Sequence, residues 1–438
     1  MLRYFVIFFI KELQMPESYK LFNRTREHLE CIENETLAPY AVRSKGVSRL
    51  YMGNYAPCKR RTEFERDKDR IIYSLAFKRL MEKTQVYVTH EGDHYTNRLS
   101  HTLEVAQISR SVASSLGLNT YLAEAIALGH DLGHTPFGHA VERVLNINLN
   151  TEEGFEHNYQ SVLVADVLEN KKFKNNEAPC GINLTNYTRY GILHHTEIKP
   201  ESTVYAYNED KISIDRSYHS LEAELVNKID TIAYLYHDLE DAIKNKTILQ
   251  DMKLNDKKQF EDFIKDLNFY TELSCKINCE DFHPITDLWE QYNANTILKA
   301  MIKDLINGTE KQIVEQNIAS LEDVKKAKSE IATFDEFSDY FKKFKKEFVK
   351  KYIYQSPIAY QMDTKAQMIA NRLFNSFAEN PNQLPYRTRN TYQMAKNGEL
   401  SFKRADSGYD ISPSRVIANY IAGMTDRYAL LNYKRMFE

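Results

Sequence analysis

The stretch that decides the fold is GHDLGHTPFGH, residues 129–139. It places three histidines, one aspartate, three glycines and one proline in eleven positions. Because glycine and proline disfavour the interior of helices and strands, the stretch predicts a turn that concentrates imidazole groups. Nine of the thirteen histidines fall between positions 90 and 195, so we expect the chemistry of the protein in this part of the chain.

Helical periodicity precedes this turn. In HTLEVAQISRSVASSLGL (101–118), four apolar residues at helical spacing form one stripe, and Gly117 is typical of a helix stop. A second helix is expected to begin near Asn119 or Thr120 and to run into the histidine-rich stretch. The short connection between the two helices predicts an antiparallel hairpin.

Helix is also expected over most of the remaining chain. We predict helices over residues 66–83 and 221–246, with 250–380 helical and carrying charged faces. Strand-like alternation at 204–207 and 211–214 predicts a short hairpin, and 396–414 a loop or small hairpin. The predicted fold class is therefore all-α with a small β excursion.

Composition excludes several classes of protein. The 438 residues suit one large domain or two joined ones, and a net charge of −3 argues against a generic nucleic-acid binder. Five cysteines without a CxxC pair argue against a disulfide scaffold or an all-cysteine zinc site, and favour a reducing, cytoplasmic setting.

The N-terminus contains an apolar run of seven residues, Tyr4 to Ile10. It is far shorter than the roughly 20 residues that a membrane helix needs, and no small-residue cleavage site follows it. We interpret it as a buried segment or oligomer contact, and a natural start at Met15 is the alternative. No later window is apolar enough to span a bilayer.

A metal site is indicated by the spacing of potential ligands. The helical hairpin places His101 beside His130 and Asp131, which lie at the end of the second helix. Asp230 lies on the 221–246 helix with Tyr234 and Asp238 at i, i+4 and i+8, a pattern that is also typical of a solvated face. Two histidines and two aspartates suit a divalent ion such as Mn, Mg, Fe or Zn. A helix cap or a satisfied core histidine is the alternative for the adjacent His-Asp pair.

Several segments of the sequence resemble those of a known protein family. RLSH (98–101), HDLGHTPFGH (130–139) and Asp230 resemble the HD-domain metal-dependent phosphohydrolases, and finer motifs resemble their deoxyguanosinetriphosphate triphosphohydrolase-like branch. These finer motifs, in family order, are RDKDRIIYSLAFKRLMEKTQVY (66–87), GHAVERVLN (138–146), FEHNYQS (155–161), INLTNYTRYGIL (182–193), SLEAELVNKIDTIAYLYHDLED (220–241), LPYRTR (384–389) and YIAGMTDRYALLNYKRMF (420–437).

The resemblance implies an HD-domain helical fold in three parts. These are an N-terminal extension (1–36), an HD phosphohydrolase core (37–250) and a helical C-terminal region (251–438) that completes the pocket and oligomer contacts. The implied metal ligands are His101, His130, Asp131 and Asp230, for Mn or Mg, with Fe, Zn or Ni as alternatives.

The resemblance also implies the reaction: a deoxynucleoside triphosphate is cut at its α-phosphorus to deoxynucleoside and triphosphate. His139 and Glu142 correspond to a pair that works in proton transfer, and their i, i+3 spacing allows the carboxylate to orient the imidazole. His134 and His157 are further catalytic candidates, with helix capping as the alternative for His157. Which histidine is general acid and which is general base stays open.

Substrate contacts are implied for four residues. Arg98 corresponds to a phosphate-contacting arginine, Tyr234 and Asp238 to sugar-binding positions, and Gln85 is a further candidate, while surface-helix positions are the alternative for the last three.

Two features fall outside this pattern. Family members commonly carry two successive aspartates where this chain has Asp230-Thr231, so the ligand is kept and a second carboxylate is missing. The pair His194-His195 lacks a partner carboxylate at helical spacing, so we favour a structural or pocket-lining role over a second metal site.

Basic segments indicate further partners. FKKFKKEFVKK (341–351) interleaves aromatic and lysine residues, which favours a solvated amphipathic helix, with a site for a regulatory nucleotide or single-stranded DNA as the alternative. Arg387, Arg389, Lys403 and Arg404 are further candidates for phosphate contacts. The resemblance implies a homo-oligomer, a tetramer or hexamer.

Two other functions stay open. One is a different HD-type nucleotide phosphohydrolase, for example one that releases orthophosphate. The other is a non-catalytic regulator that binds nucleotide or nucleic acid on the same scaffold.

Overall fold

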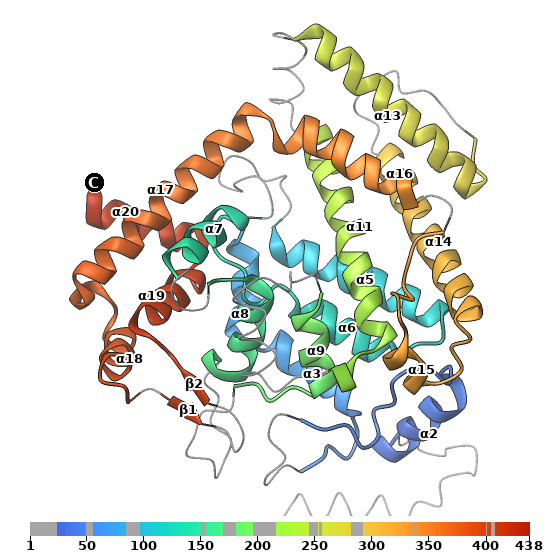
Figure 1. The fold of residues 1–438 in the computed structure, drawn as a ribbon, viewed down its shortest axis with the longest axis horizontal. Helices are drawn as coiled ribbons and strands as arrows, with labels where there is room; N and C mark the ends of the chain where they lie inside the picture. Colours follow the sequence, from blue (N-terminus) through green and yellow to red (C-terminus); the bar gives the residue numbers. More distant parts are fainter. Residues whose placement is uncertain are drawn as a thin grey trace, which may run out of the picture.

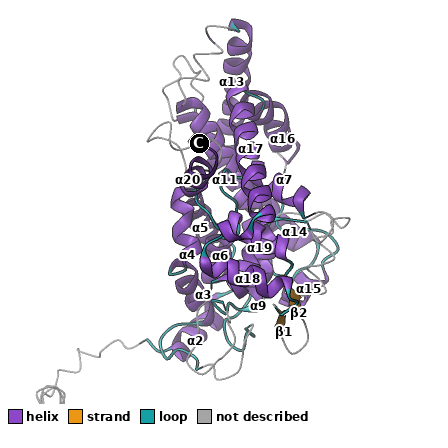
Figure 2. Cartoon of the chain, turned by 90° about the vertical axis from the view of Figure 1, so that its left-hand side faces the viewer, coloured by secondary structure: helices purple, strands orange, loops and turns teal. Residues whose placement is uncertain are grey.

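Within the part of the chain that the structure describes, the polypeptide folds almost entirely into helices, with one two-stranded hairpin (Figures 1 and 2). A computed structural model describes residues 24–49, 56–84, 97–149, 154–169, 181–195, 216–244, 253, 256–281, 292–335, 338–399, 401–403 and 408–438. The predicted all-α class with a small β excursion is confirmed.

The elements follow one another along the chain as α-helices, single 3₁₀ turns (η1, η4, η6) and two π-helical segments (η3, η5). They are α2 (Arg26–Thr36), α3 (Glu63–Ile72), α4 (Leu75–Arg79), η1 (Leu80–Glu82), α5 (Arg98–Ser115), α6 (Thr120–Gly129), α7 (His139–Asn148), α8 (His157–Leu163), η3 (Val164–Leu168), α9 (Asn186–Leu193), η4 (Arg216–Tyr218), α11 (Leu221–Lys244), α13 (Lys257–Asn278), α14 (Tyr292–Glu315), α15 (Leu321–Lys326), α16 (Ser338–Lys343), η5 (Phe344–Tyr354), α17 (Pro357–Glu379), η6 (Pro381–Gln383), α18 (Tyr386–Lys396), β1 (Ser401–Lys403), β2 (Gly408–Asp410), α19 (Pro413–Ala422) and α20 (Asp426–Phe437).

The hairpin of α5 and α6 forms as its sequence predicts. Asn97 caps α5 by accepting from the amide of Ser100, and Asn119 caps α6 by accepting from the amides of Tyr121 and Leu122. Between the helices Gly117 has a φ of 67°, a left-handed conformation that suits glycine. The hairpin places the first turn of α5 beside the end of α6.

Helix α11 crosses this hairpin and completes the centre of the molecule (Figure 1). It contacts α5, α6 and α9 through a buried apolar face that includes Leu225, Ile229 and Ile232. The predicted helix over 221–246 is therefore present as α11.

Two separate clusters of buried apolar side chains hold the helices together. The larger one joins α3, α5, α6 and α11 with α13, α14 and η5. The smaller one joins α7 with α17, α19 and α20, which lie together at the left of Figure 1. Each cluster removes apolar surface from water, which is the main stabilising contribution to such a fold.

One predicted helix is wrong in its extent. Residues 66–83 were expected to form a single helix, but α3 begins at Glu63 and ends at Ile72. The hydroxyl of Ser74 then accepts a hydrogen bond from the amide of Phe77 and starts α4. A capping serine satisfies a free helix-end amide, so it favours a new helix over continuation of the old one.

The remaining predictions divide into two groups. The region 396–414 does contain a small hairpin, in which Ser401 pairs with Asp410 and Phe402 with Tyr409. The expected hairpin at 204–214 and the apolar run at 4–10 lie outside the described residues. None of the helices in the described ranges is long and apolar enough to cross a membrane. The domain boundaries at 36 and 250 stay predictions.

Candidate metal centre and adjoining histidine cluster

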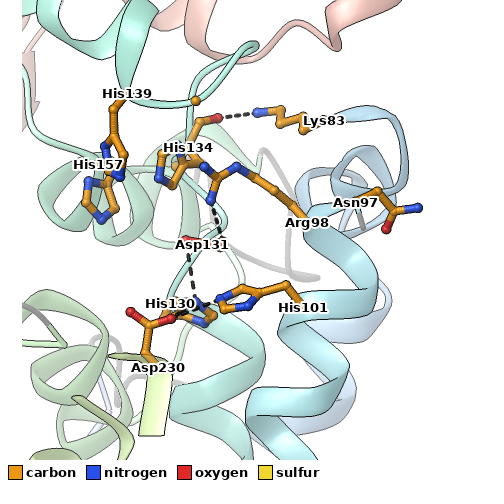
Figure 3. A network of polar contacts seen from close by, with 12 residues as sticks. Lys83, Asn97, Arg98, His101, His130, Asp131, His134, His139, His157 and Asp230 are labelled. Atoms are coloured by element: carbon orange, nitrogen blue, oxygen red, sulfur yellow. Dashed lines mark hydrogen bonds and ion pairs between the residues drawn. The ribbon is translucent and has the colours of Figure 1, made fainter. Parts of the chain in front are cut away.

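Three helices bring four potential metal ligands together (Figure 3). His101 lies in the first turn of α5, His130 and Asp131 directly follow α6, and Asp230 lies on α11. Nε2 of His101 lies 2.9 Å from Oδ1 of Asp230. Nε2 of His130 lies 3.5 Å from that oxygen and 3.5 Å from Oδ1 of Asp131. The four residues predicted as ligands therefore converge on one point.

The donor atoms fit a divalent metal ion. Ligands bound about 2.1 Å from an ion are separated by roughly 3.0–3.5 Å at adjacent positions of an octahedron or tetrahedron. The two separations from Asp230 Oδ1 are 2.9 Å and 3.5 Å, one just below this range and one at its upper end. Nε2 of His130 is buried and has no hydrogen-bond partner among the described residues, as expected of a lone pair reserved for a cation.

The other nitrogen of each histidine ligand is held by a partner. Nδ1 of His130 donates a hydrogen bond to the carbonyl oxygen of Ala127 over 2.6 Å. Nε2 is therefore the ring nitrogen that can bind a metal ion. Nδ1 of His101 faces Nδ1 of His237, whose Nε2 contacts the Glu104 carboxylate. Sequence reasoning missed His237, although its position seven residues after Asp230 places it two turns along the same helix face.

Electrostatics set the protonation of the four residues, and His130 differs from the rest. Burial opposes its charged form, but Asp131 and Asp230 raise the pKa of His130 to about 9, so this imidazole would lose a proton when a metal ion binds. Burial favours the neutral acids, but His130 and Arg98 hold the pKa of Asp131 well below its usual range. Burial raises the pKa of Asp230, but the hydrogen bond with His101 and the nearby imidazole of His130 outweigh it and hold this pKa well below its usual range. Burial lowers the pKa of His101, so its imidazole is neutral at physiological pH. Anionic oxygens and neutral imidazoles are the forms that bind metal.

A second cluster, of His134, His139, Glu142 and His157, adjoins the first (Figure 3). Nδ1 of His139 donates to Oε2 of Glu142 over 2.8 Å, and Nδ1 of His157 donates to Oε1 over 2.9 Å. The ring of His134 stacks on that of His157 with centroids 4.5 Å apart. One carboxylate thus orients two imidazoles, which the sequence predicted only for His139.

The histidines of this Glu142 cluster differ in their protonation. Although burial opposes the charged form, Glu142 and Glu156 raise the pKa of His157 to about 10. Burial, together with the positive charges of Arg98 and His157, lowers the pKa of His134 well below its usual range. At neutral pH a charged imidazole therefore stacks against a neutral one, and groups whose pKa values are pushed apart are typical of acid–base sites.

The turn between the two clusters is built as the sequence predicts. Phe137 and Gly138 both have positive φ values, 55° and 60°, and this reverses the chain before α7. The amide of Phe137 donates to Oδ1 of Asp426 over 2.9 Å. A Cβ on Gly133 would lie 2.2 Å from the backbone nitrogen of Ser161, so only glycine fits there.

Both clusters open onto one cavity of about 270 Å³. Its lining includes Arg98, Tyr234 and Thr231 together with Lys345 and Tyr354 from η5. The guanidinium of Arg98 lies between the clusters and donates from Nη1 to Oδ2 of Asp131 over 2.7 Å. Tyr354 was missed, and Lys345 was considered only as part of the basic segment 341–351, because their distance in sequence hides their proximity to the histidines.

The predicted substrate residues have different positions. Arg98 and Tyr234 line the cavity, whereas Asp238 lies behind Tyr354, whose hydroxyl donates to Oδ2 of Asp238. Burial raises the pKa of Asp238 well above its usual range, and its Oδ1 has no partner among the described residues. Gln85 lies outside the described residues.

The histidine pair after α9 is split by the fold. His194 stacks on Tyr190, with centroids 4.1 Å apart. His195 is only 1% exposed, and its ring centroid lies 5.1 Å from that of His130 and 5.2 Å from that of His157. His195 therefore lies between the metal ligands and the Glu142 cluster.

The aromatic and lysine segment 341–351 has two faces. Phe341, Phe344 and Phe348 are buried in the larger apolar cluster, and most of the lysines are exposed, as the amphipathic-helix interpretation predicts. Lys345 lines the cavity. Of the other basic candidates, Arg387 is exposed and Arg389 lies over the ring of Tyr386, while the side chains of Lys403 and Arg404 are outside the described set.

Comparison with known proteins agrees with this geometry. The family model of the HD domain matches residues 98–235, and that of the phosphohydrolase-associated domain matches residues 337–435. The chain is 37% identical to a deoxyguanosinetriphosphate triphosphohydrolase-like protein of Rickettsia felis over 410 residues, 91% of this chain and 98% of that protein. It is 38% identical to a protein of that name from Ralstonia pickettii over 403 residues, 92% of this chain and 94% of the relative. For a third, from Geobacter sulfurreducens, the identity is 34% over 417 residues, 94% and 98% of the two chains. This protein belongs to the deoxyguanosinetriphosphate triphosphohydrolase-like family of HD-domain proteins.

Proposed function

We propose that the protein is a metal-dependent deoxynucleoside triphosphate triphosphohydrolase. It cleaves the substrate at its α-phosphorus, and the products are the deoxynucleoside and inorganic triphosphate. The observation that carries this proposal is that a two-histidine, two-aspartate metal set and a carboxylate-linked histidine cluster line the same cavity, with an arginine between them. The family names of the relatives support the choice of substrate.

The metal ligands are His101, His130, Asp131 and Asp230. A divalent ion held there supplies Lewis acidity toward an α-phosphate and lowers the pKa of a water molecule at the site. The donor set suits Mn or Mg and also accepts Fe, Zn or Ni.

We assign phosphate binding to the positively charged side chains of the cavity. Arg98 is 3% exposed, and its Nε has no partner among the described residues, so it can donate to a phosphate while Nη1 holds Asp131. Lys345 also lines the cavity and adds a second positive charge. Directional donors on a buried guanidinium suit phosphate oxygens.

Recognition of the sugar falls to the α11 face. Tyr234 lines the cavity, and Asp238 reaches it through the hydroxyl of Tyr354. Because its pKa is raised, Asp238 is a neutral acid that can both donate to and accept from a sugar hydroxyl. Gln85 is assigned to the same role on the resemblance of its motif.

Proton movement falls to the Glu142 cluster. Cleavage leaves an oxygen on the deoxynucleoside that needs a proton, and a histidine supplies one near neutral pH. Glu142 holds the Nδ1 protons of His139 and His157, so their Nε2 atoms are presented for exchange. The charged His157, stacked on the neutral His134, is able to donate a proton.

The products decide between this proposal and its rivals. The protein is incubated with each deoxynucleoside triphosphate and Mn²⁺ or Mg²⁺ in ¹⁸O-labelled water. Label in the released triphosphate but not in the deoxynucleoside supports attack at the α-phosphorus. Orthophosphate indicates another HD-type phosphohydrolase, and no turnover even with nucleotide mixtures indicates a non-catalytic regulator. Asp230→Asn, which removes one metal ligand, is the negative control.

We further propose a cytoplasmic homo-oligomer, a tetramer or hexamer. Tyr73, Leu75 and Met81, around α4 and η1, are 70%, 58% and 57% exposed, and such apolar side chains suit contacts between copies. Light scattering should give a smaller mass for Leu75→Glu than for the unaltered protein.

A regulatory nucleotide or single-stranded DNA is assigned to the exposed lysines of 341–351, and alanine there should alter activation or DNA retention without changing metal content.

A further inference from the structure

We infer that Asp426, together with Lys83 and Thr84, positions the acid–base histidines for proton transfer. The three residues are buried, at 1%, 2% and 3% exposure, and they are not among the described residues that line the cavity. They contact instead the turn that carries His134 and leads to His139. The inference rests on the proposed function and adds to it residues that act through the catalytic groups.

This turn connects two parts of the molecule. It starts at Asp131, directly after α6, whose apolar face belongs to the larger apolar cluster. It ends at His139, the first residue of α7, whose apolar face belongs to the smaller cluster. The path of the turn therefore sets how the Glu142 cluster faces the proposed metal centre.

Asp426, the first residue of α20, holds the turn at Phe137. Its Oδ1 accepts from the amide of Phe137 over 2.9 Å. Its Oδ2 accepts from the amide of Thr84 over 2.9 Å and also from the Thr84 hydroxyl. Both oxygens of one buried carboxyl group are thus engaged, and they fix the turn relative to residue 84.

Phe137 is a residue that needs such support. Its φ of 55° lies in the left-handed region, which a bulky side chain rarely adopts. Residues in this region persist only where the surrounding structure holds them, and they are common at active sites. The ring of Phe137 packs against the smaller apolar cluster, while Asp426 holds its amide. Loss of the Asp426 contact should therefore let the turn relax and carry His134 and His139 with it.

Lys83 holds the same turn at a second point (Figure 3). Its Nζ donates to the carbonyl oxygen of His134 and, over 2.9 Å, to that of Ala422 at the end of α19. Its own carbonyl oxygen accepts from the amide of Arg98 over 3.1 Å, in the first turn of α5. Lys83 and Thr84 therefore join the turn both to α5 and to the connection between α19 and α20.

The helices around this junction are held together without it. Buried apolar side chains of α7, α17, α19 and α20 pack in one cluster, so α20 does not depend on Asp426 for its attachment. The hydrogen bonds of the Asp426 side chain go to Thr84 and Phe137. This arrangement favours a role in aligning the turn over a role in folding alone.

The test uses the step that needs a well-placed proton. In the proposed reaction the oxygen of a water molecule bonds to the α-phosphorus and releases a proton to solvent. The bond between phosphorus and the 5′-oxygen breaks, and that oxygen takes a proton from the Glu142 cluster. A deoxynucleoside triphosphate with sulfur in place of the 5′-oxygen releases a thiol instead. A cysteine thiol has a pKa of about 8.5, far below that of an alcohol, so sulfur leaves without needing that proton.

Asp426→Asn is compared with the unaltered protein on the oxygen and the sulfur substrate. Since a misplacement of about 1 Å can slow a reaction by roughly 100-fold, we expect kcat for the oxygen substrate to fall by about that factor. Cleavage of the sulfur substrate should stay close to the unaltered rate, and KM and Mn²⁺ content should not change. The matched control is Asp323→Asn on α15, because Asp323 also accepts from one amide and one hydroxyl, those of Ala319 and Ser320. It should behave as the unaltered protein on both substrates.

A pair of variants at Thr84 decides the question if Asp426→Asn does not fold. Thr84→Val removes the hydroxyl that donates to Asp426, whereas Thr84→Ser retains it. We expect Thr84→Val to lose activity on the oxygen substrate alone, by a smaller factor than Asp426→Asn. Thr84→Ser should recover that activity.

Three results separate the inference from the proposed function. Equal losses on the two substrates, or an unchanged kcat in Asp426→Asn and Thr84→Val, would overturn the inference and leave the proposed function standing. A loss of bound Mn²⁺ in either variant would also overturn it, because the contacts would then act on the metal centre. If the unaltered protein cleaves no deoxynucleoside triphosphate, the proposed function is wrong and the inference falls with it.

Discussion

Nδ1 of His101 lies 3.2 Å from Nδ1 of His237, and Nε2 of His237 contacts Glu104. When Nε2 of His101 binds a metal, its Nδ1 carries the proton and donates to Nδ1 of His237. His237 then donates from Nε2 to the Glu104 carboxylate. The chain from His101 through His237 to Glu104 therefore fixes both the tautomer and the orientation of one ligand.

Breaking this chain should weaken the metal site. We expect His237→Phe to lower Mn²⁺ affinity by about 10–100-fold, the usual effect of removing a partner behind a ligand. Titration of the stripped protein with Mn²⁺ measures the change. His219, whose Nε2 donates to Glu224 over 2.7 Å, forms a similar pair away from the ligands, so His219→Phe should leave the affinity unaltered. Equal affinity in the two variants would show that His237 does not position His101.

Glu142→Gln should separate proton transfer from metal binding. An amide cannot accept from both His139 and His157 as the carboxylate does, and removing its charge lowers the pKa of His157 from about 10 toward the ordinary range. We expect kcat to fall by about 10²–10⁴-fold, the contribution typical of general acid–base catalysis. His157 should then lose its proton at lower pH, so the alkaline limb of the pH–rate profile should move down in pH. Arg143→Gln on the same helix, which breaks only an exposed ion pair with Asp363, is the control. A profile of unchanged shape would contradict the assigned role.

Tyr354→Phe should act on substrate binding. Its hydroxyl donates to Oδ2 of Asp238, whose other oxygen already lacks a partner among the described residues. Removing the hydroxyl leaves a buried acid without support, which costs about 1–3 kcal/mol. We expect a higher KM for deoxynucleoside triphosphates, with metal content unchanged. A KM equal to that of the unaltered enzyme would remove Asp238 from the substrate site.

Lys345 and its neighbour Lys346 form a matched pair for testing the basic segment. Both lysines are exposed, but only Lys345 lines the cavity. Lys345→Ala should raise KM by about tenfold, since a charge-assisted contact to phosphate contributes roughly 1.5–3 kcal/mol before screening by solvent. Lys346→Ala should leave KM unchanged. The same KM in both variants would assign the whole segment to a solvated face.

Lys83 should make stability depend on pH. Burial lowers its pKa from 10.5 to about 7, while Nζ donates to the carbonyl oxygens of His134 and Ala422. The unfolded chain binds this proton more tightly, so the free energy of unfolding should rise by at most about 1.4 kcal/mol per pH unit between pH 7 and 10. Below pH 7 both states are protonated, and the contribution is constant.

Lys83→Met removes this titration. Urea unfolding at several pH values should show that the stability difference between the unaltered protein and the variant widens in favour of lysine as the pH rises. Lys68→Met removes a partly exposed lysine that pairs with Glu124 and serves as the control. A constant difference across pH 7–9.5 would contradict the shifted pKa.

The metal set was predictable because it depends on local signals. Gly117 and Asn119 define a short helical connection, and a short connection leaves little freedom in where His101 meets His130 and Asp131. The polar stripe that contains Asp230 was equally typical of a solvated face, and the resemblance of its motif selected Asp230 as a ligand. The turn at Phe137 and Gly138 followed from the density of glycine and proline.

The rest of the site depends on contacts between segments distant in sequence. Tyr354 reaches Asp238 across 116 residues, and no local pattern distinguishes it from the many other tyrosines of the chain. His195 lies beside the rings of His130 and His157, which belong to other segments, so its own surroundings in the sequence do not reveal its place in the site. The break between α3 and α4 depends on one serine whose capping role a simple apolar periodicity does not reveal.

The residues of the site lie on helices that belong to two different clusters of buried apolar side chains. The proposed metal ligands lie on α5 and α11 and directly after α6, and the apolar faces of these helices belong to the larger cluster. His139 and Glu142 stand on α7, whose apolar face belongs to the smaller cluster with α17, α19 and α20. A partner, a neighbouring copy or a truncation that displaces α17 would therefore move His139 and Glu142 relative to the cavity. The proposed metal ligands, which lie in the larger cluster, would keep their positions. The position of the C-terminal helices can therefore change the rate of turnover without changing metal binding.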